Sequence, residues 1–157
     1  MAHLLVPDII TGIWTYRSWR NSDDLTIKPE DLLFGSGYIQ IDAAPFNEFR
    51  GKIFGPHSDT NPNPKSKPYG WELHLKGSCN YGDPFSFRFQ GTGLVDGSLW
   101  VYDYQGYMIK PWPNSDIQVP SMVGTIVRTI PHPDTKGGTA PAGVVASWYA
   151  VRYNEDK

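Results

Sequence analysis

Residues 85–109 read Phe-Ser-Phe-Arg-Phe-Gln-Gly-Thr-Gly-Leu-Val-Asp-Gly-Ser-Leu-Trp-Val-Tyr-Asp-Tyr-Gln-Gly-Tyr-Met-Ile, and this stretch predicts the fold around it. Two alternating runs flank the pair Asp96-Gly97, which favours the tight turn of a two-residue hairpin loop. That turn fixes the register, because it sets Gly93 opposite Trp100 and Phe89 opposite Tyr104. The stretch therefore predicts a long β-hairpin with two different faces.

Either face of this hairpin could line the interior of the protein, and the two would form different interiors. One face carries Phe85, Phe87, Phe89, Gly91, Gly93, Trp100, Tyr102, Tyr104, Gly106 and Met108. If it points inward, it forms an aromatic pocket suited to a flat or hydrophobic molecule, and apolar rings favour this arrangement. The other face carries Arg88, Gln90 and Asp103. If it points inward instead, it buries a charged cluster, which is costly without a function. The sequence leaves both alternatives open.

The composition favours one all-β domain over residues 1–157. The chain has 157 residues, 39% of them apolar, with 16 Gly, 14 Pro and a 14% aromatic share, which is typical of short strands joined by turns. We expect eight strands, at 9–19, 32–42, 47–54, 69–78, 85–95, 98–109, 121–130 and 143–153. Eight antiparallel strands in up-and-down order can close into a barrel, and a β-sandwich is the alternative.

Charge and motifs exclude several classes of function. The net charge of −2 provides no general attraction to nucleic acid or to anionic membranes, so we expect neither as a partner. The single Cys79 and an N-terminus without a signal-peptide pattern favour a cytoplasmic location. The four histidines lack the short spacing of metal ligands, and no phosphate-binding motif occurs, so we expect no metal and no cofactor.

Loop lengths predict where a pocket would open. In an up-and-down barrel, successive connections fall at alternate ends. The long connections 20–31, 55–68 and 131–142 would then share one end with the Asp96-Gly97 turn. We expect this end to be the open mouth and the opposite end to be closed.

The first predicted strand carries a short motif, Thr11-Gly12-Ile13-Trp14. It resembles the Gly-x-Trp opening of the calycins, the lipocalin and avidin-like barrels, and its Thr is similar to the avidin version. The resemblance implies that Trp14 closes the bottom of the barrel and that an Arg from a late strand packs over it. Arg152 would fill that role. It also implies that Tyr16 and Ser18, which follow the Trp, face a ligand.

Several residues are candidates for chemistry inside such a barrel. Arg128 lies on the more apolar face of the seventh strand, where it could hold a carboxylate, phenolate or enolate oxygen. A structural ion pair is the alternative for this residue. His132, in a predicted rim loop, could act as an acid or base. The predicted catalytic residues are Tyr16, Tyr102, Asp103 and Arg128. The predicted ligand-binding residues are Trp14, Ser18, Trp71, Arg88, Phe89, Trp100, Tyr104 and His132.

These residues predict a β-barrel that binds one small hydrophobic or aromatic molecule. Its activity would be a cyclisation, isomerisation or lyase step on an aromatic or polycyclic compound, without a cofactor. A non-catalytic carrier with the same pocket is the alternative, and a carbohydrate-binding module is a third. Arg17 and Trp19, predicted to point outward, could belong to a homodimer interface.

Overall fold

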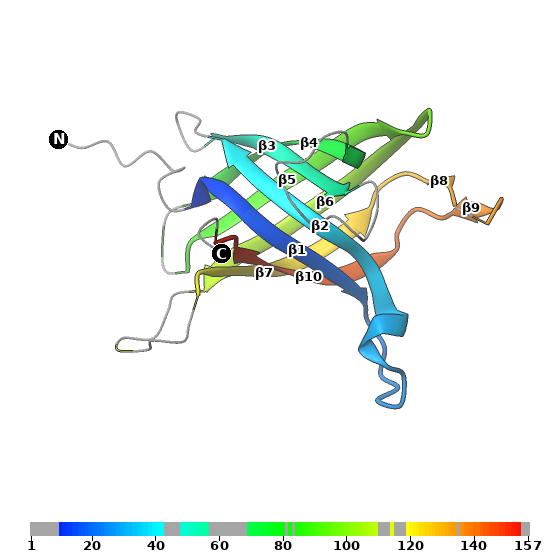
Figure 1. Cartoon of the computed structure of the whole chain (residues 1–157), viewed down its shortest axis with the longest axis horizontal. Coiled ribbons are helices and arrows are strands. Elements are labelled where there is room, and N and C mark those ends of the chain that lie inside the picture. Colours follow the sequence, from blue (N-terminus) through cyan, green and yellow to red (C-terminus); the bar gives the residue numbers. More distant parts are fainter. Residues whose placement is uncertain are drawn as a thin grey trace.

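The chain forms a closed antiparallel β-barrel of eight strands in this computed structural model (Figure 1). The structure describes residues 10–42, 48–56, 69–80, 82, 84–109, 114, 119–134 and 136–154. The barrel strands are β1 (Gly12–Arg20), β2 (Leu33–Asp42), β3 (Glu48–Pro56), β4 (Tyr69–Asn80), β5 (Ser86–Val95), β6 (Ser98–Ile109), β7 (Ser121–Arg128) and β10 (Val145–Arg152). Each one pairs with its neighbours in sequence, and β1 closes the barrel against both β2 and β10. The prediction of an eight-stranded antiparallel barrel is confirmed, and the β-sandwich is excluded.

The central hairpin has the predicted turn and register. Asp96 has φ 50° and Gly97 has φ 80°, the left-handed conformations that a tight two-residue loop requires. Gly93 pairs with Trp100, and Phe89 pairs with Tyr104. The side chains of Phe89 and Tyr104 are buried, so the aromatic face points into the barrel.

One end of the barrel is closed by Trp14 and Arg152, which are partners across β1 and β10. The Trp14 side chain is 0% exposed, and its indole N–H donates to the carbonyl of Ile10 over 2.8 Å. The Arg152 guanidinium carbon lies 4.3 Å from the Trp14 ring centre, and its Nη1 donates to the Thr11 carbonyl over 2.8 Å. This is the arrangement that the calycin resemblance implied for the closed end.

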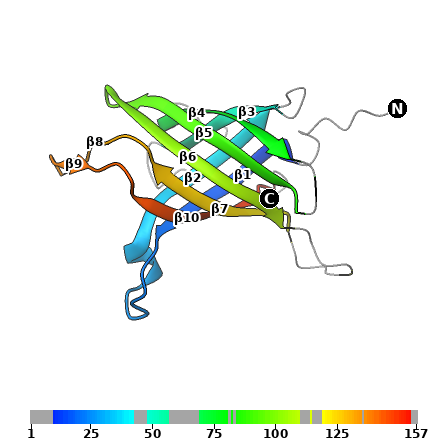
Figure 2. The same ribbon diagram turned by 180° about the vertical axis from the view of Figure 1, so that it is seen from behind.

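Two small strands lie outside the barrel, in the connection from β7 to β10. They are β8 (His132–Pro133) and β9 (Thr139–Ala140), and Figure 2 shows this ribbon projecting beyond the ends of β7 and β10. The Asp134 carboxylate organises the turn between them, because it accepts the backbone N–H groups of Lys136 and Gly138 over 2.9 and 2.7 Å. The sequence predicted an irregular loop here. Two-residue strands are too short for an alternating pattern to show them.

The glycine pair Gly106 and Gly124 allows β6 and β7 to approach closely. A Cβ on Gly124 would lie 1.8 Å from the Gln105 carbonyl oxygen, which is a backbone atom that cannot move aside alone. We expect Gly124→Ala to lower the free energy of unfolding by about 1–3 kcal/mol, the usual cost of overpacking. Urea unfolding measures this. Thr125→Ala, at the exposed neighbouring position, is the control, and an equal effect of both variants would contradict the steric explanation.

Candidate functional site

The barrel interior contains a pocket of about 230 Å³ at the end where the connections after β1, β5 and β7 lie. Six aromatic side chains form most of its wall: Tyr16, Phe34, Trp71, Trp100, Tyr102 and Tyr104. Ser18 and Gly35, paired across β1 and β2, complete one side. The pocket is smaller than the roughly 300–1,000 Å³ of sites for drug-sized ligands. It therefore suits a molecule of one or two rings, which is smaller than the polycyclic compounds that the sequence left open.

Two of the tyrosines are joined in a hydrogen-bonded chain at the inner end of the pocket. The Tyr16 hydroxyl is hydrogen-bonded to the side chains of Ser18 and Tyr104. Ser18 Oγ also donates to the Gly35 carbonyl over 3.4 Å. Burial raises the pKa of Tyr16 and of Tyr104 above the ordinary value of 10.0. A tyrosine with the ordinary pKa is already protonated at neutral pH, and the raised pKa keeps these two hydroxyls protonated in more alkaline solution as well.

The third tyrosine, Tyr102, connects the pocket to a basic pair. Its hydroxyl oxygen lies 2.7 Å from His132 Nε2, and Arg128 Nε donates to the same oxygen over 3.2 Å. Burial raises the pKa of Tyr102, while the hydrogen bond and the charge of Arg128 act to lower it; burial has the larger effect. This network gives the hydroxyl of a pocket-lining tyrosine two polar partners.

Arg128 is held in place by contacts on several sides. Its guanidinium carbon lies 5.1 Å from the Phe34 ring centre and 5.8 Å from that of Tyr102. Its Nη1 donates to the Pro141 carbonyl over 3.1 Å. Arg128 also pairs with Tyr102 across β7 and β6. Its positive charge is thus fixed beside Tyr102, one of the residues that line the pocket.

His132 is the least expected member of the site. The sequence placed it in a rim loop, yet its side chain is only 6% exposed. Its ring stacks on Trp100 with 3.9 Å between the centres and 12° between the planes. His132 Nδ1 lies 2.9 Å from the Pro133 carbonyl oxygen, and the β8–β9 ribbon brings the ring to this position. The structure therefore brings His132 together with Tyr102 and Trp100.

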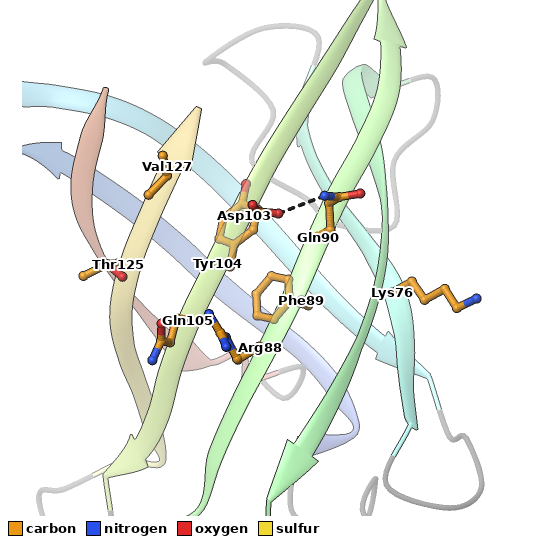
Figure 3. Close-up of a pocket in the computed structure, with 9 residues that line it drawn as sticks. All are labelled: Lys76, Arg88, Phe89, Gln90, Asp103, Tyr104, Gln105, Thr125 and Val127. Atoms are coloured by element: carbon orange, nitrogen blue, oxygen red, sulfur yellow. Dashed lines mark hydrogen bonds between the residues drawn. The ribbon is translucent and has the colours of Figure 1, made fainter. Parts of the chain in front are cut away.

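Two predicted site residues lie on the outside of the barrel. Asp103 and Arg88 are both exposed, and Figure 3 shows them beside an outer groove of about 470 Å³. Asp103 Oδ1 accepts a hydrogen bond from Gln90 Nε2 over 2.9 Å (Figure 3). Since strand residues alternate between the two faces, turning Phe89 and Tyr104 inward forces these polar neighbours outward. The prediction that Asp103 and Arg88 belong to an interior site is therefore corrected.

Two further predicted ligand contacts are buried but do not line the pocket. Trp14 lies at the closed end under Arg152. Phe89 stacks on Tyr104 with 4.6 Å between ring centres, so it supports a pocket residue from below. Sequence reasoning missed Phe34 and Gly35, which lie near the start of β2. The available signal was Ser18, which was predicted to face inward. A residue paired with it on the adjacent strand, such as Gly35, then also faces the interior.

Within the described ranges, no group of three or more His, Cys, Asp or Glu side chains could hold a metal ion. Among these same residues, no helix has the length and apolar character needed to cross a membrane.

The buried tyrosines predict a loss of stability at alkaline pH. An unfolded tyrosine releases its proton near its ordinary pKa of 10.0, whereas buried Tyr16 and Tyr104 retain theirs at higher pH. The unfolded state then binds fewer protons, so the free energy of unfolding falls as pH rises above 10, by up to about 1.4 kcal/mol per pH unit for each tyrosine. Urea midpoints at pH 8 to 11 measure this fall.

Tyr16→Phe should reduce the slope of this alkaline fall, because the variant has no hydroxyl to ionise at that position. Tyr107→Phe is the matched control, since Tyr107 is 47% exposed. Equal slopes for wild type and Tyr16→Phe would contradict the explanation.

Comparisons of the chain with protein-family models, with curated proteins and with solved structures found no match.

Proposed function

We propose that the protein binds one small aromatic or conjugated molecule in the interior pocket and catalyses a proton-transfer reaction on it without a cofactor. The observation that carries this proposal is Tyr102, a residue that lines an aromatic pocket and whose hydroxyl is hydrogen-bonded to Arg128 and His132. Rings on several sides would hold a flat ligand. Arg128 and Tyr102 together would stabilise negative charge that develops on a ligand oxygen.

The reaction class that fits this arrangement is an isomerisation, with cyclisation and lyase steps as related possibilities. Each of them has versions that pass through an enolate or phenolate, in which negative charge develops on an oxygen, and these versions fit the site. A positioned acid–base group contributes about 10²–10⁴-fold to such a step. Tyr102 is the catalytic residue of this proposal, and Tyr16 and Tyr104 are ligand-binding residues.

A non-catalytic carrier is the second candidate. It is favoured by the mainly aromatic wall of the pocket, which can hold a ligand without reacting with it. A carbohydrate-binding surface gains no support, because the rings of Trp71, Trp100 and Tyr104 line an interior pocket.

Binding can be tested through tryptophan fluorescence, because Trp71 and Trp100 line the pocket. We expect saturable quenching at one ligand per chain for members of a panel of one- and two-ring compounds. The double variant Trp71→Phe, Trp100→Phe should lose most of the signal. A panel with no saturable response would overturn the proposal.

Enzyme and carrier are separated by what happens to the bound compound. Chromatography after incubation with excess ligand shows a rearranged product for an enzyme and unchanged ligand for a carrier. Product formation should fall about 10²-fold or more in Tyr102→Phe, which keeps the ring and removes the hydroxyl. Turnover that is equal in Tyr102→Phe and wild type would exclude Tyr102 as the catalytic residue.

A further inference from the structure

The direction of each hydrogen bond at Tyr102 follows from what its partners can donate. The Pro133 carbonyl can only accept, so His132 carries its proton on Nδ1. In the neutral ring Nε2 is then an acceptor, and the Tyr102 O–H donates to it over 2.7 Å. Arg128 Nε can only donate, so the Tyr102 oxygen accepts from it. The hydrogen bonds therefore run in one direction: Arg128 donates to Tyr102, and Tyr102 donates to His132.

This order determines what Tyr102 offers to a ligand. Its proton is directed at His132 and one lone pair accepts from Arg128 Nε, so the remaining oxygen lone pair is what Tyr102 can offer to a ligand. A ligand hydroxyl that donates to this lone pair would form the first of two consecutive hydrogen bonds. The second runs from the Tyr102 O–H to His132 Nε2. Such an arrangement can move a proton over two bonds.

We propose that the pocket takes a one- or two-ring compound with an acidic hydroxyl group, a phenol or an enol, and that Tyr102 relays the proton of that hydroxyl to His132. This inference rests on the proposed function and names its ligand class. The ligand O–H bond breaks and its electron pair stays on the ligand oxygen. Tyr102 gains that proton as its own passes to Nε2. The products are a ligand anion and a His132 imidazolium that carries a proton on each nitrogen.

The charges around the network favour this outcome. After the transfer, Tyr102 donates to the ligand anion while Arg128 still donates to Tyr102, so two positive charges lie behind the new negative one. The titratable group in contact with His132 is Tyr102 from β6. Arg128 from β7 donates to the same Tyr102 oxygen, and Tyr16 and Tyr104 interact with Tyr102. The ribbon that carries His132 also carries Asp134, whose carboxylate accepts the backbone N–H groups of Lys136 and Gly138.

The geometry also argues against a cationic ligand. Aromatic pockets often bind ammonium groups. Here the Phe34 and Tyr102 rings already have the Arg128 guanidinium within 5.1 and 5.8 Å, so a second cation beside them would be repelled. An acidic hydroxyl compound avoids this repulsion and gains from the same charge.

The test uses 4-nitrophenol, a one-ring probe that is colourless as the phenol and yellow as the phenolate. Absorbance titration of the probe with excess wild-type protein, over pH 5 to 9, gives the ionisation midpoint of the bound probe. We expect this midpoint to lie about one pH unit or more below that of the free probe, since nearby positive charge shifts an acid by about 1–3 units.

Two variants separate a relay from a merely structural role. Tyr102→Phe keeps the ring, and His132→Gln can accept the Tyr102 hydrogen bond but cannot take up a proton. For each variant the protein concentration is set above its own dissociation constant for the probe, measured by fluorescence, and both variants should then lose the shift in midpoint. Tyr107→Phe, an exposed tyrosine of the same strand, should behave as wild type.

The outcomes distinguish the two proposals. Saturable binding of 4-nitrophenol with an unshifted midpoint overturns the relay and leaves the binding function standing. A full shift in His132→Gln overturns the role of His132 as the proton acceptor. If neither 4-nitrophenol nor any one- or two-ring compound binds wild type, both proposals fall.

Discussion

Gly35→Leu should lower ligand affinity by about 100-fold or more, equivalent to about 2.7 kcal/mol, while the protein remains folded. Gly35 faces the pocket opposite Ser18. A Cβ there would meet Ser18 Oγ at 3.5 Å and Tyr16 Cε1 at 3.9 Å, both ordinary contact distances. The backbone can therefore accept a side chain at this position, and the four carbons of Leu would occupy space that a ligand needs. Fluorescence titration and urea unfolding measure the two effects.

Two neighbouring substitutions act as controls for this prediction. Gly35→Ala adds one carbon and should keep affinity within a few-fold of wild type. Gly37→Leu should instead destabilise the fold, because a Cβ there would lie 2.3 Å from the Phe54 carbonyl oxygen. If Gly35→Leu binds ligand as wild type does, the ligand does not occupy the interior pocket.

The fold was predictable because one tight turn determined so much of it. Asp96-Gly97 set the hairpin register, and the long connections at 20–31 and 131–142 do fall at the end where the pocket opens. The third long connection, 55–68, extends mostly over residues outside the described part of the chain. Strand alternation then separated the two faces of each strand, but the choice of the inner face needed the closed barrel itself.

The candidate site was harder to predict because its contacts join strands that are connected by long loops and not by a tight turn. Tyr102 and Arg128 are direct neighbours across β6 and β7, yet the long sequence between these strands gives no register. His132 reaches Tyr102 only because the short β8–β9 ribbon turns its ring onto Trp100. The sequence named all four residues as candidates, and only the structure shows which of them touch.

The second large effect concerns Trp14, which the structure assigns to the closed end instead of the pocket. We expect Trp14→Ala to lower the free energy of unfolding by about 3–5 kcal/mol, the usual cost of removing a large buried ring. The Trp14 side chain is fully buried, its N–H satisfies the Ile10 carbonyl, and its face supports the Arg152 guanidinium. All three contributions are lost together, and a domain of this kind has about 5–15 kcal/mol of total stability.

Ligand binding by the folded Trp14→Ala protein should stay within a few-fold of wild type, because Trp14 does not line the pocket, whose walls come from the opposite end of β1. Urea midpoints measure stability, and titration at low temperature, where the variant is still folded, measures affinity. Ile13→Ala, the outward-facing neighbour, is the control and should cost much less. A folded Trp14→Ala protein with strongly reduced affinity would contradict this separation, since it would mean that the closed end shapes the pocket. Unchanged affinity in a strongly destabilised variant would show that the barrel keeps its stability at one end and its binding chemistry at the other.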